Sequence, residues 1–255
     1  CKDEIVKNLR KVMEEVLRPE NFCVSYTGER ESLDTVKTQA AEIKKVLFNG
    51  QKPEPVKQAP CVKKNEAFKT SGQVQYVAQN GNFRKKGLEY TGALDILKVI
   101  LSYDYLWINI RVKGGAYGCM SGFKRNGESF LVSYRDPHLK RTLEVYQGVP
   151  DYIRAFEADE REMTKYIIGT ISNKDVPRTP QMQGSISKTA YFSNVTEDML
   201  QKERNQILGA QKEDIQKLAA LVEAVLSDDQ ICVVGSETAI KKAEDVFMEV
   251  KPLIG

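Results

Sequence analysis

The chain has 255 residues, of which 41% are hydrophobic and 29% are charged, proportions that are ordinary for a globular protein of one large or two small domains. Its 38 basic and 35 acidic residues nearly cancel to a net charge of +3, which gives no electrostatic case for binding nucleic acid or a membrane surface. No apolar stretch approaches the ~20 residues needed to span a bilayer, so we expect neither nucleic acid nor a membrane as a partner.

The first 50 residues predict a helix, a strand and a second helix. Apolar residues at helical spacing predict helices over residues 3–17 and 31–48, and Pro19 ends the first of them. The β-rich residues 21–26 predict a short strand between the helices. So short a piece buries little apolar surface, and we interpret residues 1–50 as the C-terminal part of an α+β domain that begins earlier.

A domain boundary follows this piece. Gly50 and three prolines among Lys and Gln predict a linker over residues 51–65, and residues 66–255 then form a second α+β domain. The first part of that domain predicts three features in order: a strand over residues 73–79, an apolar helix over 88–110, and a hairpin of strands 116–124 and 128–135 that turns at Asn126-Gly127.

The rest of the second domain is predicted to be mainly helical. Gly148 breaks a helical pattern over residues 138–157, and residues 175–195 are irregular until a helix from Ser187. Thr196 is a good N-cap residue for the helix after it. The remaining predicted elements are helices over 159–173, 196–208, 214–226 and 237–249 and a strand over 231–234. This order predicts the α+β class, with a mainly antiparallel sheet and helices packed on one face.

The cysteines indicate a reducing compartment. There are five of them, widely spaced and without a C-x-x-C pair: Cys1, Cys23, Cys61, Cys119 and Cys232. This pattern fits neither a zinc ribbon nor a disulfide scaffold, and reduced thiols suit the cytoplasm or an organellar matrix. Because the chain begins with Cys1 rather than Met and continues at once into a helical pattern, we expect a processed chain or a fragment, whose parent could carry a targeting signal.

One segment between the apolar helix and the hairpin combines glycines with polar side chains: Arg111-Val112-Lys113-Gly114-Gly115-Ala116-Tyr117-Gly118. Adjacent glycines permit backbone angles closed to other residues, so we expect a sharp turn that presents Arg111 and Tyr117 at one rim. Arg is a fixed cation with a planar donor fork, and the Tyr phenol donates a hydrogen bond. Arg111 and Tyr117 are therefore our candidate catalytic and substrate-binding residues, and they need a partner that supplies the reactive centre.

A plainer interpretation of the same two residues stays open. An Arg at a helix end often binds the carbonyl groups there, and a Tyr at the start of a strand often only packs against its neighbours. Spacing does not decide between this interpretation and the functional one.

Other sites of catalysis are not supported by the sequence. The single histidine, His138, follows Asp136-Pro137 at a corner and we expect a structural or surface role, since no H-E-x-x-H or H-x-x-E-H occurs. The glycines of residues 114–118 precede a strand, whereas phosphate loops follow one and open a helix. Ser185 and Ser187 have no base beside them, and we interpret them as part of a plain loop.

The segment Ile110–Gly118, followed by the hairpin and by Tyr134-Arg135-Asp136-Pro137, resembles the C-terminal half of presequence proteases. These belong to the pitrilysin/insulinase (inverzincin) family of zinc metallopeptidases. The resemblance covers nearly all of the chain. It implies a two-part enzyme that closes around an unstructured peptide, with zinc held by the N-terminal half through H-x-x-E-H and a downstream Glu. No metal ligand is implied in this chain.

The resemblance also implies roles for the candidate residues. Arg111 and Tyr117 are the pair that reaches across the chamber, with Tyr117 donating to the developing oxyanion and Arg111 holding the substrate backbone or the same oxygen. The partners implied are the peptide substrate and the N-terminal zinc-bearing half, and this fragment is expected to be inactive without that half. The alternative is a catalytically inactive peptide-binding or scaffold module of the same fold. A nucleotide-binding protein that uses the glycine turn is a weaker third possibility.

Overall fold

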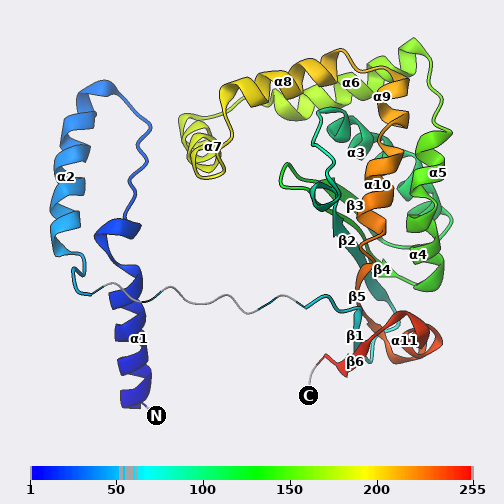
Figure 1. Ribbon diagram of the computed structural model, residues 1–255, viewed down its shortest axis with the longest axis horizontal. Helices are drawn as coiled ribbons and strands as arrows, with labels where there is room; N and C mark the ends of the chain where they lie inside the picture. Colours follow the sequence, from blue (N-terminus) through cyan, green and yellow to red (C-terminus); the bar gives the residue numbers. More distant parts are fainter. Residues whose placement is uncertain (1, 52–53, 55–59, 61, 254–255) are drawn as a thin grey trace. The chain divides into compact units, whose positions relative to one another are not determined.

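A computed structural model describes residues 2–51, 54, 60 and 62–253 of the chain (Figure 1). Cys1, Cys61 and most of the predicted linker over 51–65 lie outside the described residues. The chain divides into two compact units. The first combines the residues up to 61 with Pro177–Thr196, and the second combines Val62–Val176 with the residues from Glu197 onward. The assignment of two domains that meet at residues 51–65 stays a prediction.

The first unit is helical where the sequence predicts helices. It contains α1 (Lys2–Val16), two short 3-10 turns (Pro19–Asn21 and Arg30–Ser32), α2 (Leu33–Val46) and α7 (Pro180–Phe192). The strand predicted over 21–26 is wrong, because residues 22–27 have no regular structure. A strand needs a neighbour for its backbone hydrogen bonds, and the described part of this unit contains none.

Helix α7 begins earlier than the sequence pattern suggests. The Thr179 side chain accepts a hydrogen bond from the Met182 N–H at 3.3 Å, and Pro180 occupies the first turn, where its missing N–H costs nothing. Ser185 and Ser187 therefore lie on a helix and not in a loop. Helix α7 belongs to the first unit because Gly184 lies so close to Thr27 that a Cβ atom at position 184 would be 2.1 Å from Thr27 Oγ1.

The described residues of the second unit form one six-stranded sheet in the order β3-β4-β2-β5-β1-β6 (Figure 1). Three of the pairings are antiparallel, and the pairings of β1 with β5 and β6 are parallel. The predicted α+β class with a mainly antiparallel sheet is confirmed. The strands are β1 (Glu66–Thr70), β2 (Gln75–Asn82), β3 (Gly118–Phe123), β4 (Glu128–Asp136), β5 (Gln230–Ser236) and β6 (Glu249–Pro252).

One face of this sheet is covered and the other is open. Along β2 the side chains of Gln75, Val77 and Gln79 are buried, whereas the alternate residues Tyr76 and Asn80 are exposed. That alternation is the period of two of a strand with one face against a core. The helices pack on the covered face, where a continuous apolar core includes residues of β1, β2, β4 and β5 together with α3, α4, α5 and α10.

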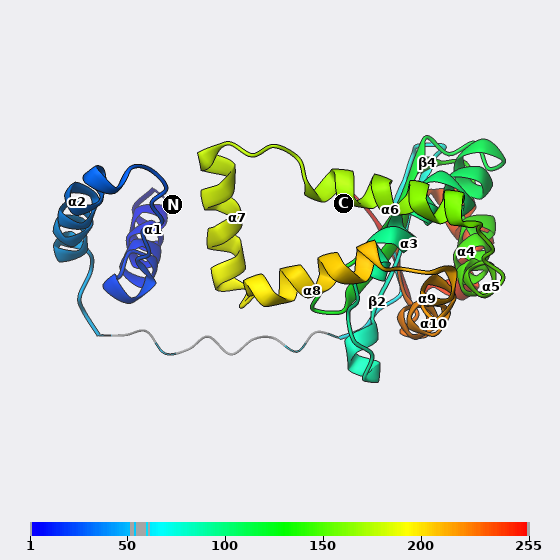
Figure 2. The ribbon, with the colours of Figure 1, turned by 90° about the horizontal axis from the view of Figure 1, so that it is seen from above.

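Two helices predicted in the second unit are each divided into two elements in the structure. The predicted helix over 88–110 is α3 followed by a π-helix, and the one over 214–226 is α9 followed by α10. The last predicted helix, over 237–249, ends at Lys242. Their bounds are α3 (Ala93–Tyr103), the π-helix η4 (Trp107–Val112), α4 (Lys140–Gln147), α5 (Val149–Arg154), α6 (Glu160–Lys174), α8 (Glu197–Leu208), α9 (Lys212–Gln216), α10 (Ala219–Leu226) and α11 (Glu237–Lys242), with 3-10 turns at Phe83–Lys86 and Glu244–Val246. Helices α3, α6 and α8 pack on one another (Figure 2).

Among the described residues, no helix combines the length and the apolar character that crossing a bilayer requires.

Candidate functional site at the glycine turn

The turn predicted between the apolar helix and the hairpin is present and is tied back to the π-helix. The Gly115 N–H donates to the Arg111 carbonyl at 2.9 Å, and the Ala116 N–H donates to the Ile110 carbonyl at 3.1 Å. The Tyr117 N–H then donates to the Arg135 carbonyl at 3.3 Å, which begins the pairing of β3 with β4. The turn is therefore a fixed connection with satisfied backbone groups.

At each of the three glycines in this segment, a side chain would be unfavourable for a different physical reason. A Cβ atom at Gly114 would lie 2.3 Å from the Ile110 carbonyl oxygen, and one at Gly118 would lie 2.4 Å from the Tyr134 ring. Gly115 has a φ of +79°, a conformation that L side chains rarely adopt. Gly114 thus allows close packing against the end of the π-helix, Gly115 allows a left-handed turn, and Gly118 leaves room for the Tyr134 ring.

Tyr117 is displayed to solvent by this turn. Its side chain is 60% exposed, and its ring lies against Tyr134 with the centroids 5.4 Å apart at an angle of 60°. The guanidinium carbon of Arg135 lies 5.6 Å from the centroid of the Tyr117 ring. In the part of the chain that the structure describes, no hydrogen bond occupies the Tyr117 hydroxyl, which is therefore available to a ligand.

Arg111 is exposed as well. Its guanidinium carbon lies 4.1 Å from the centroid of the Trp107 ring, an arrangement that orients the planar donor fork and leaves its N–H groups available. Within the described ranges, Arg111 makes neither an ion pair nor a hydrogen bond to the carbonyls of the helix end. The geometry therefore differs from the plainer interpretation, in which the side chain binds those carbonyls.

The remaining polar groups near the turn serve the fold. Asp136 is buried and accepts hydrogen bonds from the His138 N–H at 2.9 Å and the Thr142 hydroxyl at 2.7 Å. The His138 side chain is exposed. Burial is the main cause that raises the pKa of the Cys119 thiol to about 11, with Asp136 adding to the effect and Arg111 opposing it. A thiol that stays protonated at neutral pH is a poor nucleophile.

In the described part of the chain, the pair belongs neither to a metal-binding cluster nor to the cavity between α3 and α6. Among the residues described, no group of three or more His, Cys, Asp and Glu side chains lies together so that it could hold a metal ion. A cavity of about 470 Å³ lies between α3 and α6, lined by residues that include Asp95, Lys98 and Thr170. Neither Arg111 nor Tyr117 lines it, so the pair occupies an exposed rim.

The structure adds three residues that site reasoning from the sequence did not select. The Trp107 ring stacks against the Arg111 guanidinium, and Tyr134 and Arg135 contact the Tyr117 ring. The run Tyr134-Arg135-Asp136-Pro137 was visible in the sequence as part of the resemblance. Its proximity to Tyr117 could have been found from the pairing of the two hairpin strands around Asn126-Gly127, which brings the start of one strand to the end of the other.

Comparison with known proteins assigns the chain to a family. The family profile described as the PreP C-terminal domain matches residues 65–237. The chain belongs to this presequence protease C-terminal domain family. Over 253 residues it is 43% identical to Protein HypA of Clostridium perfringens and 30% identical to Presequence protease 1, chloroplastic/mitochondrial, of Arabidopsis thaliana. These matches cover 99% and 95% of this chain but only 26% and 22% of the relatives.

Solved structures show the same fold at much lower identity. The peptidase M16 inactive domain of Pseudomonas fluorescens aligns with a TM-score of 0.54 and 16% identity, covering 88% of this chain and 52% of that one. Pitrilysin aligns with a TM-score of 0.53 and 16% identity, covering 79% of this chain and 22% of that one. The sheet with helices on one face is therefore the fold of an M16 peptidase domain.

Proposed function

We propose that this chain is the substrate-holding, non-zinc-binding C-terminal part of a peptide-degrading zinc metalloendopeptidase. The observation that carries the proposal is the pair Arg111 and Tyr117, two exposed hydrogen-bond donors. No cluster of possible metal ligands lies beside them in the part of the chain that the structure describes. Such a pair suits a site that is completed by another part of the protein. The relatives with similar sequences, which include a presequence protease, are about four times as long as this chain.

Zinc does not fit the residues that the structure describes. His138 is the chain's sole histidine, and a zinc site needs about three or four Cys, His, Asp or Glu ligands, which no described cluster supplies. We therefore assign the metal to another part of a longer protein.

The two side chains act on the peptide itself. Tyr117 donates its O–H to the carbonyl oxygen of the scissile bond, where negative charge develops during attack. Arg111 donates N–H groups to the same oxygen or to a neighbouring backbone carbonyl and so holds the peptide in place. Donors held by a rigid turn and by aromatic neighbours are oriented before the substrate arrives, and such preorganisation favours the transition state. Because both contacts are made to backbone groups, the substrate class is an unstructured, extended peptide.

Replacement of one hydroxyl tests this proposal. In the full-length protein that contains this chain, Tyr117→Phe is expected to lower kcat for peptide cleavage by roughly 10²–10³, the usual cost of losing an oxyanion donor. Bound zinc and the melting temperature are expected to stay unchanged, because the hydroxyl is exposed and has no partner in the described residues. Wild-type turnover in this variant would refute the role. If the wild-type protein binds peptides but cleaves none, the alternative of a peptide-binding module holds.

The compartment belongs to the same proposal. Reduced thiols and a peptide-degrading activity suit the cytoplasm or an organellar matrix. The remaining partner is the zinc-bearing part of the same protein.

A further inference from the structure

The run Tyr134-Arg135-Asp136 lies beside Tyr117 and has no task in the function proposed above. Arg135 has a φ of +49°, in the left-handed region that a side chain with a Cβ atom disfavours. Backbone strain of this kind persists only where the surrounding structure holds it, and it is concentrated at functional sites.

A β-bulge and a buried carboxylate hold the backbone there. Gln75 pairs with Asp136 whereas Val77 pairs with Ser133, so three steps along β4 match two steps along β2. The extra residue falls at 134–135. Immediately after it, the buried Asp136 carboxylate accepts hydrogen bonds from the His138 N–H and from the hydroxyl of Thr142 on α4. Bulges of this type change the direction of a side chain and often lie next to active sites.

The bulge places two side chains against the ring of Tyr117. The Tyr134 ring lies 5.4 Å away, and the Arg135 guanidinium lies 5.6 Å from the ring centroid. The Arg135 carbonyl also accepts the Tyr117 N–H, so one residue contacts both the backbone and the ring of Tyr117. In the described part of the chain, no carboxylate pairs with Arg135. Its contact with the ring is therefore not in competition with an ion pair.

We propose that Arg135 is a positioning residue for Tyr117. The strained bulge aims the guanidinium at the ring, and the cation–π contact together with Tyr134 fixes the direction of the hydroxyl. The inference rests on the proposed function of Tyr117 and extends it to a residue that does not touch the peptide. A surface arginine without this task would not need a left-handed backbone, which Gly or Asn adopts more readily.

The test removes the guanidinium and keeps the backbone. In the full-length protein, Arg135→Asn is expected to lower kcat about tenfold, the scale of a modest misplacement of a reacting group, with little change in KM and no loss of melting temperature. Arg135→Lys keeps a cation and is expected to recover part of kcat. Arg161→Gln, at an exposed arginine on α6, is the matched control and is expected to change nothing.

A double-mutant cycle separates positioning from a general structural effect. If Arg135 acts through the Tyr117 hydroxyl, Arg135→Asn causes no further loss of kcat in the Tyr117→Phe background. An equal loss in both backgrounds, or wild-type kcat in Arg135→Asn, overturns the inference and leaves the proposed function of Tyr117 intact. Wild-type kcat in Tyr117→Phe overturns the proposed function instead. A fall in melting temperature that accounts for the activity lost in Arg135→Asn would show a structural role only.

Discussion

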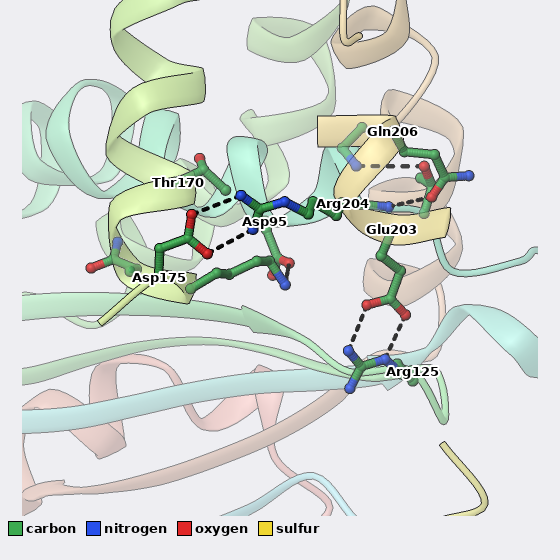
Figure 3. A network of polar contacts seen from close by, with 12 residues as sticks. Asp95, Arg125, Thr170, Asp175, Glu203, Arg204 and Gln206 are labelled. Atoms are coloured by element: carbon green, nitrogen blue, oxygen red, sulfur yellow. Dashed lines mark hydrogen bonds and ion pairs between the residues drawn. The ribbon is translucent and has the colours of Figure 1, made fainter. Parts of the chain in front are cut away.

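Two groups of arginines in the second unit are built in opposite ways. Arg125 binds Glu203 through two hydrogen bonds of 2.5 Å, and Arg204 binds Asp175 through bonds of 2.6 and 2.8 Å (Figure 3). Arg111 and Arg135, in contrast, pair with no carboxylate within the described ranges. Their guanidinium groups lie over aromatic rings, as that of Arg125 also does over Tyr90. The first group has its donors occupied, whereas the second keeps them available.

The paired group fastens helix α8 to its neighbours. The Glu203 side chain is only 8% exposed and reaches the turn of the β3–β4 hairpin, while Arg204 reaches the end of α6 (Figure 3). The hydrogen bond to Glu203 is the main cause that raises the pKa of Arg125. The glycine turn lies at the other end of the same hairpin, away from this network.

The difference between the groups separates stability from function. A bidentate pair with a buried carboxylate stabilises a fold because each charge satisfies the other. An arginine stacked on an aromatic ring keeps most of its N–H groups for a ligand. Substitutions in the carboxylate-paired group, Arg125 and Arg204, are therefore expected to change the free energy of unfolding. Substitutions of Arg111 and Arg135 are expected to change catalysis.

After Tyr117→Phe, the largest effect is expected from Gly118→Val in the full-length protein. The new side chain meets the Tyr134 ring, which must move away from Tyr117, and kcat is expected to fall by about 100-fold. Gly169→Ala is the matched control, because a Cβ atom there meets only Val99 at 3.8 Å, and it is expected to leave kcat unchanged. Peptide cleavage at wild-type rates by Gly118→Val would show that Tyr134 does not matter to the site.

A smaller effect, on stability, is expected from Glu203→Gln. The loss of the carboxylate leaves Arg125 with a weakened partner, and because Arg125 is partly exposed we expect a decrease of about 2 kcal/mol in the free energy of unfolding. Chemical denaturation measures this, and kcat per folded molecule should not change. Arg204→Gln is the comparison variant with a smaller loss, since that pair is more exposed. A loss of kcat in Glu203→Gln without a loss of stability would contradict the assignment of this ion pair to the fold.

The smallest effect concerns pH and Cys119. Its pKa is raised to about 11, chiefly by burial, against about 8.5 for an unfolded thiol. The protonated thiol therefore contributes stability that is fully present below about pH 8.5 and is lost as the pH rises towards 11. Cys119→Ala is expected to flatten this part of the stability profile. At pH 8 iodoacetamide is expected to modify the exposed Cys23 before the partly buried Cys119, and the reverse order would disagree with the raised pKa of the Cys119 thiol.

The sequence predicts the glycine turn and the hairpin better than it predicts the ends of the sheet. The two glycines and Asn126-Gly127 determine their turns locally, so the turn, the hairpin and the exposure of Arg111 and Tyr117 follow from short patterns. Strands β1 and β6 were not predicted from the sequence. Strand β1 pairs in parallel with both β5 and β6, and its partner residues lie more than 160 positions later in the chain. Short polar segments of this kind become strands through tertiary pairing.

Two other features could not be read from local patterns. The bulge at Arg135 depends on the register between β2 and β4 and on the buried Asp136, and a positive φ at an arginine has no signature in the sequence. The residues predicted as a strand over 21–26 have β propensity but no partner strand in the described part of their unit. Both cases show tertiary contacts overriding local preference.

In the proposed role the Tyr117 hydroxyl acts on the substrate, and the fold does not depend on this hydroxyl. The measurement that tests the role is kcat of the Tyr117→Phe variant of the full-length protein, per zinc-loaded, folded molecule at saturating peptide. A fall of roughly 10²–10³ with an unchanged melting temperature is the result that we predict. An unchanged kcat, or a fall that unfolding of the variant fully explains, would contradict the account.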